Sequence, residues 1–531
     1  MKLQSITLCD FRAFPGKAEY KFDFGKKNHL LIYGENGSGK SSVFKALHEF
    51  FDVRSSATSF HTQKNFFSDQ VHGEPLTCGK VSLEFDPQQA GQIKTSIDWS
   101  FQPEGTPDNR PIQDITLLEV ARRKGMLDYL SLVKVNLTEK DRMNKDQRPN
   151  LFGIMIERLL FDFPVSIAGG QQIGLGGLWL KVQKDVSLTQ THRGSNLSNN
   201  LARVQQFNDV VAKAVARIKE KADEILAHYF KHPVELTFIY KAAIYKQFAQ
   251  LYRRSIEPGY LAFDLKFLGR SFPKYEEVLN EAKLSAVALS VYLASLIEGI
   301  PKGNGEYPRI LVLDDVLIGL DMNNRLPVLE ILQTEFAAKG WQLILLTHDK
   351  IWYDYAAHQA TSIEWECYEL YADICFDAAG KKYEQPLMRK FNDGAGDFLK
   401  RAQVHIAAHD DKAAAMYARA GYEQALKKYC DDKHLPIPFY KDAKKLTSDK
   451  FLKAVEDDLT AQKSKTNPVP APDNLALMDK ALLACSDIRL HRQQVLNPLS
   501  HSSPVAVSRI EVEQAIQAVE NLIKTLKDCK T

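Results

Sequence analysis

Four residues in the stretch Gly34 to Ser42, GENGSGKSS, have the types and spacing of a phosphate-binding loop. The pattern Gly-x-x-x-x-Gly-Lys-Ser/Thr is met by Gly34, Gly39, Lys40 and Ser41. Glycines let backbone N–H groups approach an anion, the lysine reaches the β- and γ-phosphates, and the hydroxyl holds Mg²⁺. We therefore expect ATP and Mg²⁺ at this loop. The residues predicted to bind the nucleotide are Gly34, Asn36, Gly37, Ser38, Gly39, Lys40, Ser41 and Ser42.

The segments on either side of the loop are those that a phosphate site needs. The apolar run HLLIYG, His29 to Gly34, predicts a buried strand. The following KSSVFKALHEFF has apolar residues at helical spacing, so a helix is expected to begin at the loop and to add its own N–H donors. A chance glycine turn is the alternative, and the strand, loop and helix context argues against it.

Two further strand ends carry polar side chains that suit phosphate chemistry. RILVLDDVLIGLDMNNR, Arg309 to Arg325, predicts a buried strand that ends in Asp314 and Asp315. Asp314 is placed to hold Mg²⁺ through water, and Asp315 to orient an attacking water. WQLILLTHDK predicts a second strand, which ends at His348. A lone histidine at a strand end is more often structural, but its order after the loop and the acids favours catalysis. The pattern fits a parallel α/β core.

These motifs resemble a known family. GENGSGKSS, LVLDDVLIGLD and LLTHDK, in that order, resemble the ABC-type ATPase heads of SMC, RecF and related proteins. The opening ITLCDFRAFPG is similar to the family's first strand, which implies that Arg12 lies near the nucleotide. The resemblance also implies that Asp321 is the D-loop acid and His348 the switch histidine. The implied fold is an α/β, ABC-type (SMC/RecF-like) P-loop ATPase head with a helical insertion and an all-α C-terminal domain.

Such heads also need a signature segment, whose serine contacts the γ-phosphate across a dimer. The best match is EAKLSAVALSVYLASL, with Leu284 and Ser285 at the start of an apolar helix. It departs from the common LSGGQ pattern, and a plain N-cap serine on a core helix is the alternative. AGGQQIGLGG, Ala168 to Gly177, has the letters GGQ but lacks Leu-Ser, and we interpret it as a flexible loop.

The second acid of the Arg309 to Arg325 segment also departs from the family, because Asp315 stands where a glutamate is usual. The shorter side chain reaches water less well. Slow hydrolysis, with ATP acting chiefly as a dimer clamp, is therefore expected.

Domain boundaries are expected near residues 120, 232 and 384. Residues 1–120 and 233–384 would form the two lobes of the head, and residues 121–232 a helical insertion. Within it, Leu201 to Phe230 has one apolar stripe, which fits either a coiled-coil arm or a core helix. KHPVELTFIY and YLAFDLKFLG alternate like strands that return to the head. Residues 385–531 predict a helical bundle, with a proline-rich loop at Lys463 to Asn474.

Composition places this chain among ordinary globular proteins. Of its 531 residues 44% are hydrophobic and 25% charged, and the net charge of +3 is too small to argue for nucleic acid. No apolar run of membrane-spanning length and no signal peptide are apparent, so a cytoplasmic location is expected. The 7 cysteines are scattered without a CxxC pair, which indicates a reducing compartment and no zinc site.

A narrower resemblance covers roughly Met1 to Asp377. LDYLSLVKVNLTEKD, NLFGIMIERLLFDFPV, KLSAVALS and LDDVLIGLDMNNR together are similar to the PtuA-type ATPases of bacterial anti-phage systems, Septu and some retrons. This resemblance implies a homo-oligomer (a dimer or a dimer of dimers) and an HNH nuclease partner of the PtuB kind. A reverse transcriptase and its msDNA would be further partners in a retron, and nucleic acid is a possible ligand.

The C-terminal segment LHRQQVLNPLSHSS offers a different function. Arg492 and His501, with Asn497 and Ser500, resemble the Arg…His motif of HEPN ribonucleases, although the spacing is longer. A polar turn around Pro498 is the alternative. Three functions remain open. They are an ATPase that regulates a partner nuclease, a self-contained ATPase–ribonuclease toxin like RloC and PrrC, and a RecF-type repair clamp.

Overall fold

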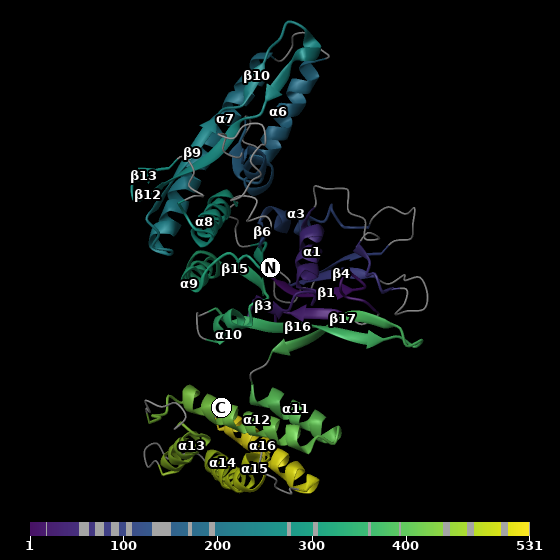
Figure 1. Cartoon of the computed structure of the whole chain (residues 1–531), viewed down its shortest axis with the longest axis vertical. Coiled ribbons are helices and arrows are strands. Elements are labelled where there is room, and N and C mark those ends of the chain that lie inside the picture. Colours follow the sequence, from purple (N-terminus) through teal and green to yellow (C-terminus); the bar gives the residue numbers. More distant parts are fainter. Residues whose placement is uncertain are drawn as a thin grey trace. The chain divides into compact units, whose positions relative to one another are not determined.

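The computed structural model divides the chain into two compact units, Met1–Phe391 and Asn392–Thr531 (Figure 1). The residues it describes are all except 17–18, 53–62, 69–78, 87–94, 102–108, 130–149, 168–171, 191–196, 273–277, 301–305, 359–362, 392–393, 439–445, 465–471, 501–507 and 530–531.

A six-stranded sheet forms the centre of the first unit, in the order β17-β16-β3-β15-β14-β6. All neighbours pair in parallel except β16 and β17. The strands are β3 (His29–Gly34), β6 (Lys124–Asp128), β14 (Arg309–Asp314), β15 (Trp341–Thr347), β16 (Trp365–Phe376) and β17 (Lys382–Phe391). The strands predicted at His29, Ile310 and Trp341 are confirmed. Because parallel strands end at one edge, the phosphate loop, the two acids and the histidine meet there.

A second, antiparallel sheet has the order β2-β1-β4-β5. Its strands are β1 (Leu3–Cys9), β2 (Tyr20–Asp23), β4 (Lys80–Phe85) and β5 (Thr95–Ser100). Helix α1 (Lys40–Phe51) shares one apolar cluster with both sheets, and α3 (Ile115–Arg122) contributes to it. Successive side chains of β3 point to opposite faces of the central sheet. Leu30 and Ile32 join this cluster, whereas Leu31 and Tyr33 join the apolar cluster on the opposite face.

The other face of the central sheet is covered by α8 (Glu281–Gly299) and its neighbours. Around it lie α5 (Phe152–Ile154), π-helix η2 (Met155–Leu159), α9 (Met322–Ile331), π-helix η5 (Leu332–Phe336), η6 (Ala337–Lys339) and α10 (Lys350–His358). In the described part of the chain, only α8 is long and apolar enough to cross a membrane, and 78% of that apolar window is buried within the protein. Burial of this kind is typical of a core helix.

The helical insertion differs from its predicted bounds. Strand β6 belongs to the central sheet although it lies within residues 121–232. Helices α6 (Leu175–Thr189) and α7 (Leu197–His228) pack together with a separate antiparallel sheet. That sheet consists of β9 (Val234–Lys241), β12 (Tyr260–Phe267) and β13 (Arg270–Ser271), with the short pair β10 (Ile244–Lys246) and β11 (Ser255–Glu257) beyond it.

The two alternating segments form strands, as predicted, but these strands do not join the central sheet. Strands β9 and β12 pair with each other, and β9 packs on α7 (Figure 1). Their alternation indicates only that one face is buried, not which partner covers it. The apolar stripe of α7 is buried as predicted. Its members are Val204, Phe207, Val211, Val215, Ile218, Ala222 and Ile225.

The glycine-rich segment Ala168 to Gly177 is described only from Gln172 onward, and this part is not the flexible loop that was expected. Its described part forms β8 (Gln172–Gly174), which pairs with β7 (Pro164–Ser166), and then the first turn of α6. A Cβ on Gly176 would lie 2.0 Å from the Phe161 ring. Gly174 and Gly176 therefore allow close packing against Phe161.

The second unit is an all-helical bundle around its own apolar cluster, as predicted. It consists of α11 (Ala395–Ala407), α12 (Asp411–Asp432), α13 (Ser448–Lys463), α14 (Pro472–His491), π-helix η8 (Arg492–Leu496), α15 (Asn497–Ser500) and α16 (Arg509–Asp528). The boundary lies at Phe391 rather than at residue 384, because β17 completes the central sheet. The expected fold class, an α/β P-loop ATPase head with an all-α C-terminal domain, is confirmed.

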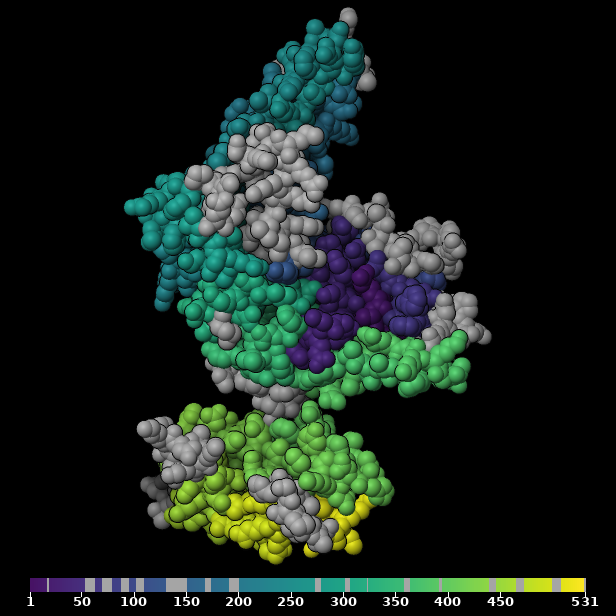
Figure 2. Space-filling view, in the orientation of Figure 1, coloured from purple at the N-terminus to yellow at the C-terminus, as the bar shows by residue number. Residues whose placement is uncertain are grey.

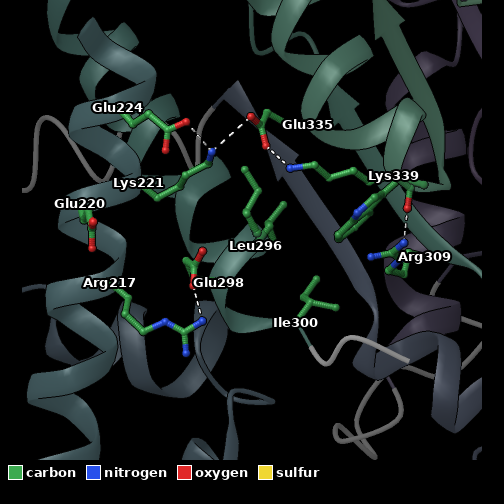
Figure 3. Close-up of a pocket in the computed structure, with 12 residues that line it drawn as sticks. Arg217, Glu220, Lys221, Glu224, Leu296, Glu298, Ile300, Arg309, Glu335 and Lys339 are labelled. Atoms are coloured by element: carbon green, nitrogen blue, oxygen red, sulfur yellow. Dashed lines mark hydrogen bonds and ion pairs between the residues drawn. The ribbon is translucent and has the colours of Figure 1, made fainter. Parts of the chain in front are cut away.

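A cavity of about 610 Å³ lies between α7, the C-terminal end of α8 and the first residues of β14 and β15 (Figure 3). Charged groups within it pair with one another. Lys221 Nζ lies 3.2 Å from Glu335 Oε1, and Lys339 donates to the other oxygen at 2.5 Å. Tyr229 donates a further hydrogen bond to Glu335 at 3.1 Å. Burial works to raise the pKa of Glu335, but the bonds from Lys339 and Lys221 outweigh it and hold that pKa below its ordinary value.

This network predicts unequal effects for its two lysines. The side chain of Lys221 is 13% exposed and that of Lys339 51% exposed. Lys221→Met should lower the free energy of unfolding by about 2 kcal/mol or more, because it removes one partner of a nearly buried pair. The matched control Lys339→Met should cost less than about 1 kcal/mol. Urea unfolding of both variants measures this, and equal losses would contradict it.

Candidate nucleotide-binding site

The phosphate loop joins β3 to α1, and its glycines are required by geometry. A Cβ on Gly34 would lie 2.3 Å from Ser38 Oγ and 2.7 Å from Lys40 Cγ, so any side chain there would disrupt the loop. Gly39, at the N-cap of α1, has φ of 96°, which side chains rarely adopt. Beyond Gly34, β16 continues as a hairpin with β17, and Pro386 of that hairpin packs against Gly39. Figure 2 shows this hairpin in green beside the purple N-terminal segments.

The residues at the sheet edge fit a magnesium–nucleotide complex. Ser41 donates a hydrogen bond to Asp314, whose other oxygen, Oδ1, is buried without a partner, as is Ser38 Oγ. Burial, and then the charge of Asp315, raise the pKa of Asp314 to about 6. A cation beside this carboxylate would offset both effects. Mg²⁺ is commonly held by one or two carboxylates together with waters and substrate phosphates, so Asp314 and the Ser41 hydroxyl are the protein groups that would hold it here.

Lys40 lies where a phosphate-binding lysine must lie, but it has protein partners. It is buried, its Nζ is 3.4 Å from the carbonyl oxygen of Glu35, and it is 3.6 Å from Asp315 Oδ2. Phosphate oxygens would compete for this ammonium group with Asp315. Binding of the nucleotide and release of the Asp315 carboxylate are therefore linked.

Asp315 connects the end of β14 to β15. It has a positive φ of 53°, and its N–H donates to the carbonyl oxygen of Leu346 at 3.0 Å. Its Oδ1 accepts from the backbone N–H of His348 at 2.9 Å and lies 2.9 Å from the imidazole Nδ1. The structure therefore brings the predicted catalytic pair, Asp315 and His348, into direct contact. His348 fixes one carboxylate oxygen, and Lys40 faces the other.

Arg12 lies in a tight turn next to the phosphate loop. Its φ is 50°, and its guanidinium donates to Gln63 at 2.6 Å. The following residue, Ala13, donates its N–H to Ser42 Oγ at 3.3 Å, which ties this turn to the start of α1. Arg12 is exposed and within the same site, so its predicted contact with the nucleotide is sterically possible and stays a prediction.

Asp321, the predicted D-loop acid, caps α9 by accepting from Asn324 N at 3.0 Å, which is a structural role. Two further residues at this edge, Arg325 and Asp349, were not predicted from the sequence. One turn later, Arg325 forms an ion pair with Asp349, the residue after His348. Asp349 also accepts from Trp352 N at 3.0 Å at the start of α10. The signal in the sequence was the acid directly after the switch histidine.

Ser285 is not the N-cap of α8, so that alternative is wrong. The cap is Asn280, which accepts from Lys283 N at 3.0 Å, and the helix begins at Glu281. Ser285 is one turn further on and only 3% exposed. A Cβ on Gly319 would lie 2.6 Å from Ser285 Oγ, so the serine packs against the loop between Asp315 and Asp321. Leu284 is buried beside it.

Only Arg492 of the predicted ribonuclease pair lies in the described residues. Arg492 is buried and forms an ion pair with Asp449 rather than facing solvent. His501 lies outside the described residues.

The positive φ of Asp315 predicts how this position tolerates change. Asp and Asn adopt that backbone conformation more readily than Glu. Asp315→Asn should retain the bond from His348 N and unfold within about 1 kcal/mol of the wild type, whereas Asp315→Glu should lose about 1–2 kcal/mol. The Asn variant should also lower ATP hydrolysis about 100-fold, because it cannot accept a proton. Unfolding and phosphate-release assays measure both, and a Glu variant as stable as the Asn variant would contradict the backbone argument.

Comparisons with known proteins agree with this site. Residues 5–226, less than half of the chain, match the family model described as AAA domain. No curated protein sequence matches the chain. Among solved structures, an SMC head domain from Thermotoga maritima is 15% identical, with 74% of this chain and 100% of that chain covered and a TM-score of 0.34.

Two ATP-binding cassettes are also similar. A nucleotide-free cassette from an ABC transporter is 11% identical, with 74% of this chain and 93% of that chain covered and a TM-score of 0.26. A dimeric cassette in a post-hydrolysis state, bound to ADP and phosphate, is 12% identical, with 73% and 99% covered and a TM-score of 0.26. The phosphate loop, the acid-ended β14 and the histidine-ended β15, together with the match to the AAA domain model over residues 5–226, support a P-loop ATPase in the first unit.

Proposed function

We propose that this protein is an ATP-binding and ATP-hydrolysing regulator of a bacterial anti-phage system, which dimerises around ATP and controls a partner HNH nuclease of the PtuB kind. The observation that carries the ATPase part is the convergence of Lys40, Asp314 and Asp315 at one sheet edge. The defence role is supported by the resemblance to PtuA-type ATPases. In a retron, a reverse transcriptase and its msDNA would be further partners.

Each residue of the site has a role that follows from its contacts. Bound MgATP supplies the phosphoanhydride bond that is cleaved. Ser41 and Asp314 would hold the ion, and Lys40 would leave Asp315 to bind phosphate oxygens. Asp315 Oδ2 would then face the attacking water, while His348 keeps Oδ1 in place. Slow hydrolysis is expected, because the short carboxylate is already held on one side.

A second copy of the chain is needed for the signature contact. Tyr129, which follows β6, lies 3.4 Å from Glu281 at the start of α8, so this helix begins beside β6. Strand β6 is three strands away from β3, which at about 4.8 Å per strand is roughly 14 Å. The start of α8 is therefore too far from the phosphate loop to contact the same nucleotide. Contact with a nucleotide held by a partner copy would require the loop at Gly319, which covers Ser285, to move.

The helical second unit is the proposed docking site for the nuclease. Leu483 and Leu490 on α14 are exposed and seven residues apart, so they lie on one face of that helix. Arg492 of the same segment is committed to Asp449. A partner nuclease is therefore favoured over a ribonuclease built into this unit.

The first prediction of this function concerns Lys40. Lys40→Ala should weaken ATP binding at least tenfold and abolish protection against phage in cells that carry the chain with its neighbouring genes, because the ammonium group reaches the β- and γ-phosphates. Titration calorimetry and plaque counts measure the two effects. Lys45→Ala, on the same helix, is the control and should change neither. Protection that persists without bound nucleotide would refute the ATP-regulated model.

The second prediction concerns assembly. In an Asp315→Asn background, which slows hydrolysis, saturating MgATP should convert monomers to dimers in size-exclusion chromatography with light scattering. Adding Ser285→Ala, a change small enough for its buried position, should reduce the dimer fraction without changing ATP binding to the monomer. Thr334→Ala, on the opposite side of the head, is the control. Dimers that form equally well without the Ser285 hydroxyl would count against it as the signature serine.

A further inference from the structure

The segment from Lys241 to Glu257, here called the arm tip, has a surface that the nucleotide site does not explain. It contains β10, the short 3-10 helix Leu251–Arg253 and β11. Three large apolar side chains on it face solvent. Tyr252 is 73% exposed, Ile244 57% and Phe248 40%. Large apolar side chains that are exposed together in one short segment often mark an interaction surface, whereas single exposed ones need no explanation.

The same segment concentrates positive charge. It contains one acidic residue, Glu257, and four basic residues, Lys241, Lys246, Arg253 and Arg254. The whole chain, in contrast, is close to neutral. Lys246 pairs with Glu257 at 2.6 Å. Arg253 remains exposed, and its guanidinium lies 5.4 Å from the centre of the Phe248 ring. Exposed cations and aromatic rings are therefore concentrated in this one short segment.

The arm tip is held rigidly on the two long helices. Tyr245 points inward, and its hydroxyl lies 3.1 Å from Thr189 Oγ1 of α6. Asn208 of α7 accepts from Ala243 N at 2.9 Å and donates to its carbonyl oxygen at 3.0 Å. Gln190 donates to the carbonyl oxygen of Arg254 at 2.8 Å. The exposed side chains are therefore presented by a fixed backbone, which lowers the entropy lost on binding.

We propose that the arm tip binds single-stranded nucleic acid. Exposed rings give bases a face to stack on, and neighbouring Lys and Arg side chains neutralise phosphates. A duplex hides its base faces, so it would use only the charges. Arg253, which lies over the Phe248 ring, can contact either a phosphate or a base, because a guanidinium group binds phosphates and also stacks on ring planes. The surface lies on α6 and α7 and uses no residue of the ATPase site, so this inference does not depend on the proposed function.

The test is fluorescence anisotropy with the full-length protein and labelled dT30, rU30 and a 30-base-pair duplex. Wild type should bind a single strand at least tenfold more tightly than the duplex. Comparing dT30 with rU30 tells which single strand is preferred. Tyr252→Ala should weaken single-strand binding about tenfold, through loss of base stacking. Arg253→Glu should weaken it and reduce the slope of log affinity against log salt.

Two exposed residues elsewhere serve as matched controls. Lys213→Glu on α7 tests charge reversal, and Phe376→Ala on β16 tests loss of an exposed ring. Both should bind like the wild type, and Lys40→Ala should too, which separates this site from the nucleotide site. Wild type that fails to bind dT30 and rU30, or Tyr252→Ala and Arg253→Glu that both bind like the wild type, would overturn the proposal. Equal affinity for single strands and duplex would also overturn it.

Discussion

The contacts of Asp315 connect the parts of this ATPase head. Its backbone N–H bonds to β15, its Oδ1 accepts from His348, and its Oδ2 faces Lys40 at the other end of the phosphate loop. One residue in the left-handed region thus links β14, β15 and α1. The strain of that conformation, about 1 kcal/mol, is offset by two hydrogen bonds with good geometry. A nucleotide that draws Lys40 away changes one of these three contacts and leaves the other two.

Helix α9 and its π-helical continuation η5 extend from this edge to the opposite side of the head. At the start, Asp321 caps α9 and Arg325 pairs with Asp349, next to His348. At the far end, Glu335 bonds to Lys221 and Tyr229 of α7. This segment, which contains Pro327 and continues as a π-helix, connects the sheet edge that carries His348 to α7. The nearly buried Lys221–Glu335 pair makes that junction specific, because an unpaired charge there is costly.

Much of the head could be predicted because its signals are local. A glycine loop between an apolar run and a helical pattern specifies its own geometry, and strands that end in polar residues specify the sheet edge. The contact between Asp315 and His348 follows from parallel pairing of β14 with β15. The positive φ of Asp315 could not be predicted, since it depends on the carbonyl oxygen of Leu346 and on His348, more than thirty residues away in sequence.

The errors arose where a local pattern allows more than one long-range partner. Alternation in β9 and β12 predicts a half-buried sheet but not which helix covers it, so the packing of these strands on α7 could not be predicted. The burial of Ser285, in contrast, was predictable. From Leu284 onward α8 is apolar on every side, and a helix of that kind is buried all round. A signature serine on it can reach a partner's nucleotide only if the loop at Gly319 moves away, so the dimer contact and the loop before Asp321 must change together.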